Sequence, residues 1–138
     1  MVKIIFNYHL YLDAIIEGRK GLNPFMDYFN ITISDVSPGK VIFKMPIRPE
    51  FLHPANTPVV SANEAIAHAM MTMLNPDEGL TTIELKSNFL SGVDRGELVA
   101  EATVFKKGQI LMIGDCLVRN DEGKNVCRVS ATFMLLKK

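Results

Sequence analysis

The sequence predicts an α+β protein in which a curved antiparallel β-sheet wraps around one long hydrophobic helix. Residues 57–74 are apolar or small on almost every side of a helix, and a helix of that kind belongs inside a protein. Segments on both sides of it alternate apolar and polar residues, as half-buried strands do. Short turns join the last three of these segments, which is typical of an antiparallel meander.

The bounds of the central helix follow from its capping residues. A helix that starts at Thr57 places Pro58 in its first turn, where proline is well tolerated. Ser61 with Glu64 also forms a capping box, so the start is open by one turn. At the other end, Asn75-Pro76 stops the helix, because proline cannot continue the hydrogen-bonding ladder.

The polar residues inside this helix are the first candidates for chemistry. Glu64, His68 and Thr72 are spaced by four and therefore share one face, with Ser61 just before them. Glu64 has a structural alternative as a helix cap, and His68 has one as a paired residue at an interface. A neighbouring carboxylate favours the charged imidazole, so a role for His68 is expected to show as a pH dependence in the ordinary histidine range.

The remaining elements are expected in a simple order. They are a short helix over 10–17, a loop over 22–25, a strand over 29–34, a turn over 37–40, a strand over 41–45, and, after the central helix, strands over 81–90, 97–105, 110–119 and 126–136. The loop over 22–25 follows from Asn23, because a residue before proline avoids the helical region. No repeat or linker interrupts the pattern, so a single domain over residues 1–138 is expected.

Composition narrows the class of protein. The 138 residues include 15 Lys and Arg and 15 Asp and Glu, and a net charge of zero argues against a nucleic-acid partner. No apolar run reaches the roughly 20 residues that cross a bilayer, and the first residues lack the cleavage site of a signal peptide. A cytoplasmic protein without a membrane partner is therefore expected.

The cysteine content and the hydrophobicity add two expectations. Cys116 and Cys127 are too few for a disulfide framework, so they are expected to be reduced thiols of the core on two arms of a hairpin. With three scattered histidines they form no metal site, and no metal or redox cofactor is expected. A mean hydropathy of +0.16 is high for a small monomer, which suggests apolar surface buried between subunits.

Several short motifs from about residue 23 onward carry a family resemblance. They are Val36-Ser37-Pro38-Gly39-Lys40, Arg48-Pro49-Glu50-Phe51-Leu52-His53-Pro54, Thr82-Ile83-Glu84-Leu85-Lys86, Asn88-Phe89-Leu90, Gly96-Glu97-Leu98 and Gly123-Lys124. With the element order, they resemble the hot-dog fold thioesterases, in particular the phenylacetyl-CoA and 4-hydroxybenzoyl-CoA type. The resemblance implies a homodimer or homotetramer with the active site between subunits. It also implies a coenzyme A thioester as substrate, with its carbonyl held by backbone N–H groups at the start of the central helix.

The chain departs from that family at the catalytic residues. The family's His-Gly-Gly before the helix is missing, and Asn56-Thr57-Pro58-Val59-Val60 stands in a shorter segment there. Ala62-Asn63-Glu64-Ala65 resembles the family's Ala-Asp-Glu-Ala, which places Asn63 at the catalytic aspartate, although an amide cannot act as a general base. Glu64 takes this role if the register slips by one residue. If the residues missing relative to the family lie inside the helix, His68 moves towards the catalytic position.

Candidates for substrate binding follow from the same resemblance. They are His53, Asn56, Thr57, Val59, Val60 and Asn88. The backbone N–H groups of residues 57–60, except that of Pro58, are candidates for an oxyanion hole because the start of a helix leaves them unpaired. Asn88 is a candidate for contact with a pantetheine arm, and its structural alternative is to satisfy a sheet edge.

These observations predict an acyl-CoA-type thioester hydrolase, with either water or Glu64 as the nucleophile. The alternative is a catalytically inactive hot-dog protein that binds an acyl thioester or serves as an assembly subunit, which Asn63 and the shortened segment favour. A third and weaker possibility is a hydratase or dehydratase of the same fold.

Overall fold

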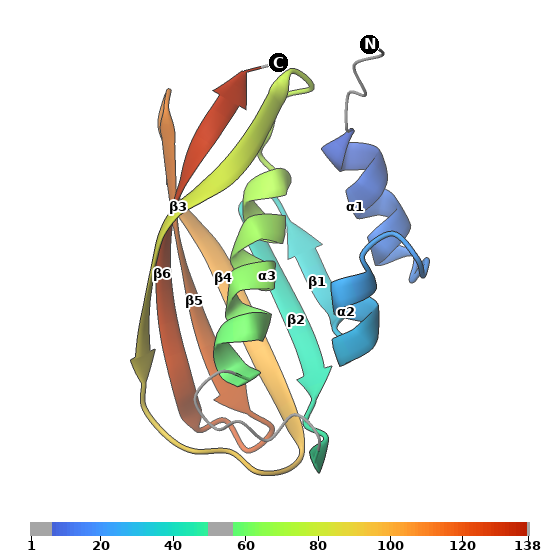
Figure 1. Ribbon diagram of the computed structural model, residues 1–138, viewed down its shortest axis with the longest axis vertical. Coiled ribbons are helices and arrows are strands. Elements are labelled where there is room, and N and C mark those ends of the chain that lie inside the picture. Colours follow the sequence, from blue (N-terminus) through green and yellow to red (C-terminus); the bar gives the residue numbers. More distant parts are fainter. Residues whose placement is uncertain (1–6, 50–56, 138) are drawn as a thin grey trace.

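The computed structural model describes residues 7–49 and 57–137, with the backbone alone for residues 57–60 (Figure 1). Its elements are α1 (Tyr8–Ile16), α2 (Pro24–Phe29), β1 (Thr32–Ser37), β2 (Lys40–Pro46), α3 (Thr57–Met71), β3 (Glu78–Phe89), β4 (Glu97–Lys107), β5 (Leu111–Asn120) and β6 (Asn125–Lys137). The strands after α3 lie within a few residues of the predicted ranges. No helix of the described residues is long and apolar enough to cross a membrane.

The strands form one six-stranded antiparallel sheet in the order β1-β2-β4-β5-β6-β3. The meander of β4, β5 and β6 is present as the short turns predict, and β3 pairs with β6 at the far side. β1 and β3 are therefore the edge strands. An antiparallel sheet with a few helices confirms the predicted α+β class.

Helix α3 lies along one face of the sheet and contacts β2, β4, β5 and β6 (Figure 1). No side chain from residue 61 to residue 74 is exposed, as expected for a helix that is apolar nearly all round. The helix can approach β5 closely because Gly114 has no side chain. A Cβ at that position would lie 3.0 Å from Ile66 Cγ2 and 3.0 Å from Met70 Cε.

The segment before β1 differs from the sequence prediction. Residues 22–25 were expected as a loop followed by a strand from residue 29, but Pro24–Phe29 forms the short helix α2. Asn23 is its N-cap, with Oδ1 accepting the Met26 N–H at 3.1 Å, and Pro24 occupies the first turn. The non-helical conformation of Asn23 before Pro24 is therefore that of a helix N-cap and does not mark a loop. Asn30, with φ 53°, ends the helix in the left-handed region.

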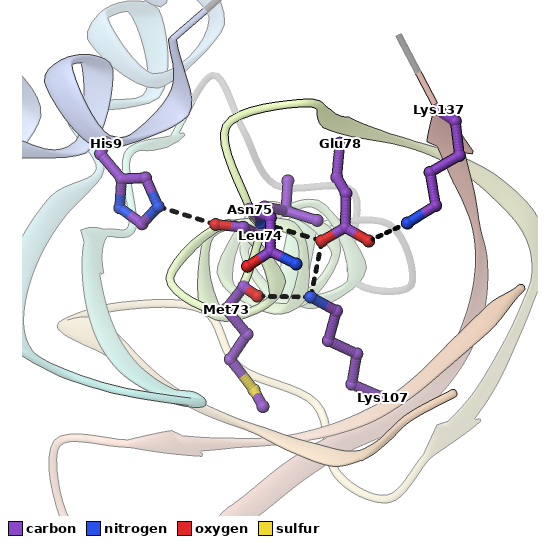
Figure 2. Close-up of polar contacts among 7 residues, drawn as sticks. All are labelled: His9, Met73, Leu74, Asn75, Glu78, Lys107 and Lys137. Atoms are coloured by element: carbon purple, nitrogen blue, oxygen red, sulfur yellow. Dashed lines mark hydrogen bonds and ion pairs between the residues drawn. The ribbon is translucent and has the colours of Figure 1, made fainter. Parts of the chain in front are cut away.

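The carboxyl end of α3 is closed by a buried carboxylate between two lysines (Figure 2). The Glu78 side chain is 2% exposed and accepts from Lys107 Nζ at 2.6 Å, from Lys137 Nζ at 2.8 Å and from Asn75 N–H at 2.8 Å. Lys107 Nζ also donates to the Met73 carbonyl at 2.8 Å. These bonds satisfy the Met73 carbonyl and the Asn75 N–H in the turn that follows the helix. The two lysines, Lys107 first, lower the pKa of Glu78 to about 2.

Both cysteines are free and buried, as the sequence predicts. Cys116 lies on β5 and Cys127 on β6, with side chains in the core between the sheet and α3. Burial raises the pKa of both thiols. They are therefore protonated packing residues.

Candidate functional site

Two polar residues on one face of the central helix, Glu64 and His68, meet the two N-terminal helices, whereas Thr72 on the same face bonds to Gly39 and Ala69. Glu64 Oε2 lies 3.3 Å from Asn23 Nδ2, the amide of the residue that caps α2. The same oxygen lies 3.8 Å from His68 Nδ1. The Glu64 side chain is 21% exposed, so it is not fully closed off from solvent. The structure therefore brings Glu64 and His68 together, as their spacing predicts.

The His68 side chain is almost completely buried among the described residues. The side chain is 1% exposed, Nδ1 lies 2.7 Å from the Glu64 carbonyl oxygen, and Nε2 lies 2.7 Å from the Tyr11 hydroxyl. The ring also stands edge-on to Phe43 of β2, with 5.0 Å between centroids. Burial lowers the pKa of His68 to about 4, while the bond to the Glu64 carbonyl opposes this shift. The imidazole is neutral at pH 7.

The expectation that Glu64 favours a charged imidazole is therefore wrong. The short contact of His68 is with the backbone carbonyl of Glu64, and the carboxylate lies beyond hydrogen-bond distance. The loss of hydration of the His68 ring outweighs the attraction of the Glu64 carboxylate for a proton on the ring, because desolvation disfavours the charged form.

Burial has the opposite effect on the carboxyl group. Desolvation raises the pKa of Glu64 above its ordinary value, and the hydrogen bond from Asn23 partly offsets this. A carboxylate with a raised pKa holds a proton more readily, which is the property that a general base needs. Glu64 is thus chemically suited to take a proton from water.

Tyr11 and Asn23 belong to the same cluster, and the sequence analysis did not single them out. Asn23 Nδ2 donates to the Tyr11 hydroxyl at 3.0 Å as well as to Glu64. Burial raises the pKa of Tyr11, so the hydroxyl keeps its proton. The Asn-Pro pair was a usable signal for a cap at Asn23. No local pattern links Tyr11 to His68, which is 57 positions away.

Asn63 precedes Glu64 on α3 and is half-buried. Its Oδ1 is buried and has no hydrogen-bond partner among the described residues. A buried acceptor without a partner costs free energy and calls for an explanation. The amide has no acid–base chemistry near neutral pH, so a donor group on a ligand is the kind of partner that this oxygen accommodates.

The substrate-binding candidates do not all lie in one described region of the structure. His53 and Asn56 lie outside the described residues. Thr57, Val59 and Val60 lie in the first turn of α3, where helix geometry leaves backbone N–H groups without intrahelical partners. Asn88 is exposed on the edge strand β3, opposite Arg128 of β6, and does not join the cluster around Glu64.

No group of three His, Cys, Asp or Glu side chains among residues 7–49 and 57–137 is arranged to hold a metal ion. The cluster around Glu64 combines one carboxylate with a neutral imidazole, a phenol and an amide.

The sequence pattern of the thioesterase superfamily matches residues 51–127. The match spans more than half of the chain and includes α3 with all of its polar residues. The chain therefore belongs to the thioesterase superfamily, and the resemblance to hot-dog thioesterases is confirmed. No curated protein sequence gives a significant match.

Solved structures share the fold at low sequence identity. A thioesterase family protein from Silicibacter pomeroyi has 22% identity and a TM-score of 0.81, over 92% of this chain and 99% of that one. A thioesterase from Haemophilus influenzae has 20% identity and a TM-score of 0.76, over 81% and 82%. A phenylacetic acid degradation-related protein from Ralstonia eutropha has 19% identity and a TM-score of 0.79, over 90% and 98%. At these identities the likeness shows the fold.

Proposed function

We propose that this protein hydrolyses an acyl thioester of the coenzyme A type and that Glu64 is the reactive carboxylate. The observation that carries the proposal is the environment of Glu64 on α3 of a thioesterase-superfamily chain. The carboxylate is half-buried, its pKa is raised by burial, and Asn23 holds one of its oxygens. It follows the start of α3 by about two turns.

The amino end of α3 supplies the second part of the proposed site. The thioester carbonyl oxygen would accept hydrogen bonds from the backbone N–H groups of Thr57, Val59 and Val60, where the helix dipole favours negative charge. Glu64 would take a proton from water as the water attacks the carbonyl carbon, or would attack the carbon itself to form an anhydride that water opens. In both routes the C–S bond breaks and the sulfur leaves as a thiolate, which then takes up a proton from water or from the protonated Glu64.

The other candidates have supporting roles in this proposal. His68 would hold the turn of α3 around Glu64, since both of its nitrogens are within hydrogen-bond distance of protein groups. Asn63 would accept a hydrogen bond from the substrate through its unpaired Oδ1. His53, Asn56 and Asn88 would contact the coenzyme arm in a site shared between two copies of the chain.

A protein that binds an acyl thioester without hydrolysing it is the second candidate. It is favoured by Asn63, whose amide stands where the resemblance places the catalytic aspartate. No metal or redox cofactor enters either proposal.

Hydrolysis of acetyl-, palmitoyl- and phenylacetyl-CoA, followed by release of free thiol, tests the two candidates. Turnover of at least one substrate is expected, and Glu64→Gln should lower kcat at least about 100-fold because the amide cannot accept the proton. Activity should rise with pH through a value above 4.5, since burial raises the pKa of Glu64. Glu122→Gln, on the exposed turn between β5 and β6, is the matched control and should leave the rate unchanged.

The outcomes separate the candidates. Unchanged turnover in a folded Glu64→Gln protein removes Glu64 from the mechanism. Tight thioester binding without thiol release supports the binding protein. In that case Asn63→Asp, which places a carboxylate at the family's catalytic position, should produce hydrolysis.

A further inference from the structure

The hydrogen bonds around His68 have one consistent set of directions. Asn23 Oδ1 accepts the Met26 N–H at 3.1 Å, so Nδ2 is the atom that faces Tyr11 and Glu64. The Glu64 carbonyl can only accept, so His68 Nδ1 carries the ring proton. The imidazole is neutral, so Nε2 has a lone pair and the Tyr11 hydroxyl must donate to it.

Tyr11 is the junction of this network. Its hydroxyl hydrogen goes to His68 at 2.7 Å, and its oxygen accepts from Asn23 at 3.0 Å. One phenol therefore connects α1, the cap of α2 and the middle of α3. Without the hydroxyl, the Asn23 amide loses one of its two acceptors and the buried Nε2 of His68 loses its donor.

We infer that Tyr11 is a positioning residue for the Glu64 carboxylate, acting through the Asn23 amide and the His68 ring. The N-terminal helices are then part of the functional site and not merely a cover for α3. The catalytic consequence of this inference rests on the proposed function, whereas the geometric consequence does not.

The charges around the cluster are compatible with this role. Glu64 is faced by Tyr11 of α1, by Asn23 before α2 and by the neutral His68 of α3. Asp27 of α2 acts with Glu64 to disfavour the phenolate, which keeps the Tyr11 hydroxyl protonated. On the side of the sheet, β2 presents the apolar ring of Phe43 to His68.

A direct test follows the Glu64 carboxyl carbon by ¹³C NMR through a pH titration in Tyr11→Phe. The pKa of Glu64 is expected to rise relative to the native protein, because the Asn23 amide that lowers it is less firmly held. Tyr28→Phe is the matched control, since the Tyr28 ring is 64% exposed on α2, and it should leave the titration unchanged. An unchanged titration in Tyr11→Phe overturns the inference.

A second measurement needs no variant and decides the matter if Tyr11→Phe fails to fold. The ¹⁵N shifts of the His68 ring in the native protein should report a neutral imidazole with its proton on Nδ1 at pH 7. A proton on Nε2 overturns the inference, because Tyr11 would then be an acceptor and the network would not have the stated direction.

Kinetics separate a failure of this inference from a failure of the proposed function. Tyr11→Phe should lower kcat about tenfold with KM changed less than about twofold, as expected when a reactive group is misplaced. If Glu64→Gln loses activity while Tyr11→Phe keeps the native kcat, the inference is wrong and the proposed function stands. If Glu64→Gln has no effect, the proposed function fails and the two NMR measurements still decide the role of Tyr11.

Discussion

His68 illustrates how the surroundings of one residue decide its charge. A carboxylate oxygen 3.8 Å from Nδ1 attracts a proton to the ring, yet a ring that is 1% exposed loses nearly all of its hydration. Desolvation is the larger effect, and the pKa falls to about 4. The Glu64–His68 pair is therefore a carboxylate beside a neutral ring, and no ion pair forms at neutral pH.

Because His68 is neutral in the folded protein, the free energy of unfolding should fall as the solution becomes acidic. His68 has a folded pKa of about 4 against 6.5 when unfolded, so its contribution is complete above pH 6.5 and is lost as the pH falls towards 4. The full loss is about 3 kcal/mol. Urea unfolding from pH 7 to pH 4 should show a smaller decline for His68→Gln than for the native protein, and equal declines would contradict the prediction.

At the scale of elements, the end of α3 depends on contacts from three different strands. Glu78 comes from β3, Lys107 from β4 and Lys137 from β6, and together they close the turn after the helix (Figure 2). From the opposite side, His9 of α1 donates through Nε2 to the Leu74 carbonyl at 2.7 Å. The helix is thus fixed at its carboxyl end by charge-assisted bonds.

The two lysines of this cluster should contribute unequally. Lys107→Met should lower the free energy of unfolding by about 2 kcal/mol, because it removes bonds to a buried carboxylate and to the Met73 carbonyl. Lys137→Met, whose side chain is 61% exposed, is the matched control and should cost less than about 1 kcal/mol. Chemical denaturation at pH 7 measures both, and a larger effect of Lys137→Met would contradict this account.

The same cluster should respond to acid. The pKa of Glu78 lies at about 2 in the fold, so its stabilising contribution is complete above about pH 4.5 and is lost as the pH falls towards 2. Above pH 4.5 only the His68 effect operates, so the two effects can be separated by pH.

At the scale of the whole molecule, the sheet ends in a long edge strand whose outer side has no partner among the described residues. β3 spans 12 residues at the end of the strand order, and its Ile83 and Phe89 are 55% and 54% exposed. An edge of this length exposes backbone groups that can pair with another strand. The edge supports the proposal that two copies of the chain share the site, because β3 offers a strand through which they would pair.

Self-association should therefore be sensitive to charge on this edge. Ile83→Lys should shift the protein towards the monomer, because it replaces an exposed apolar side chain of the edge strand with a charged one. Leu10→Lys is the matched control, since Leu10 is 67% exposed and belongs to α1 and not to β3. Light scattering after size-exclusion chromatography measures the mass, and a native protein that is monomeric would contradict the proposal.

Local patterns determined much of the architecture. The uniform apolarity of residues 57–74 identifies a buried helix, and the two-residue alternation from residue 97 onward identifies the meander, because both periodicities are properties of neighbouring residues. The spacing of Glu64 and His68 likewise places them on one helix face. The Asn23-Pro24 pair was misread, because an extended residue before proline is compatible with a loop and with a helix cap.

Tertiary structure alone decided the partners and the charges at the candidate site. Tyr11 meets His68 across 57 positions and Asn23 meets Glu64 across 41, and no local spacing encodes such pairs. The neutral state of His68 and the raised pKa of Glu64 depend on how completely the fold excludes water. Exclusion of water is a property of all the elements packed around a group, so a pattern along the chain cannot reveal it.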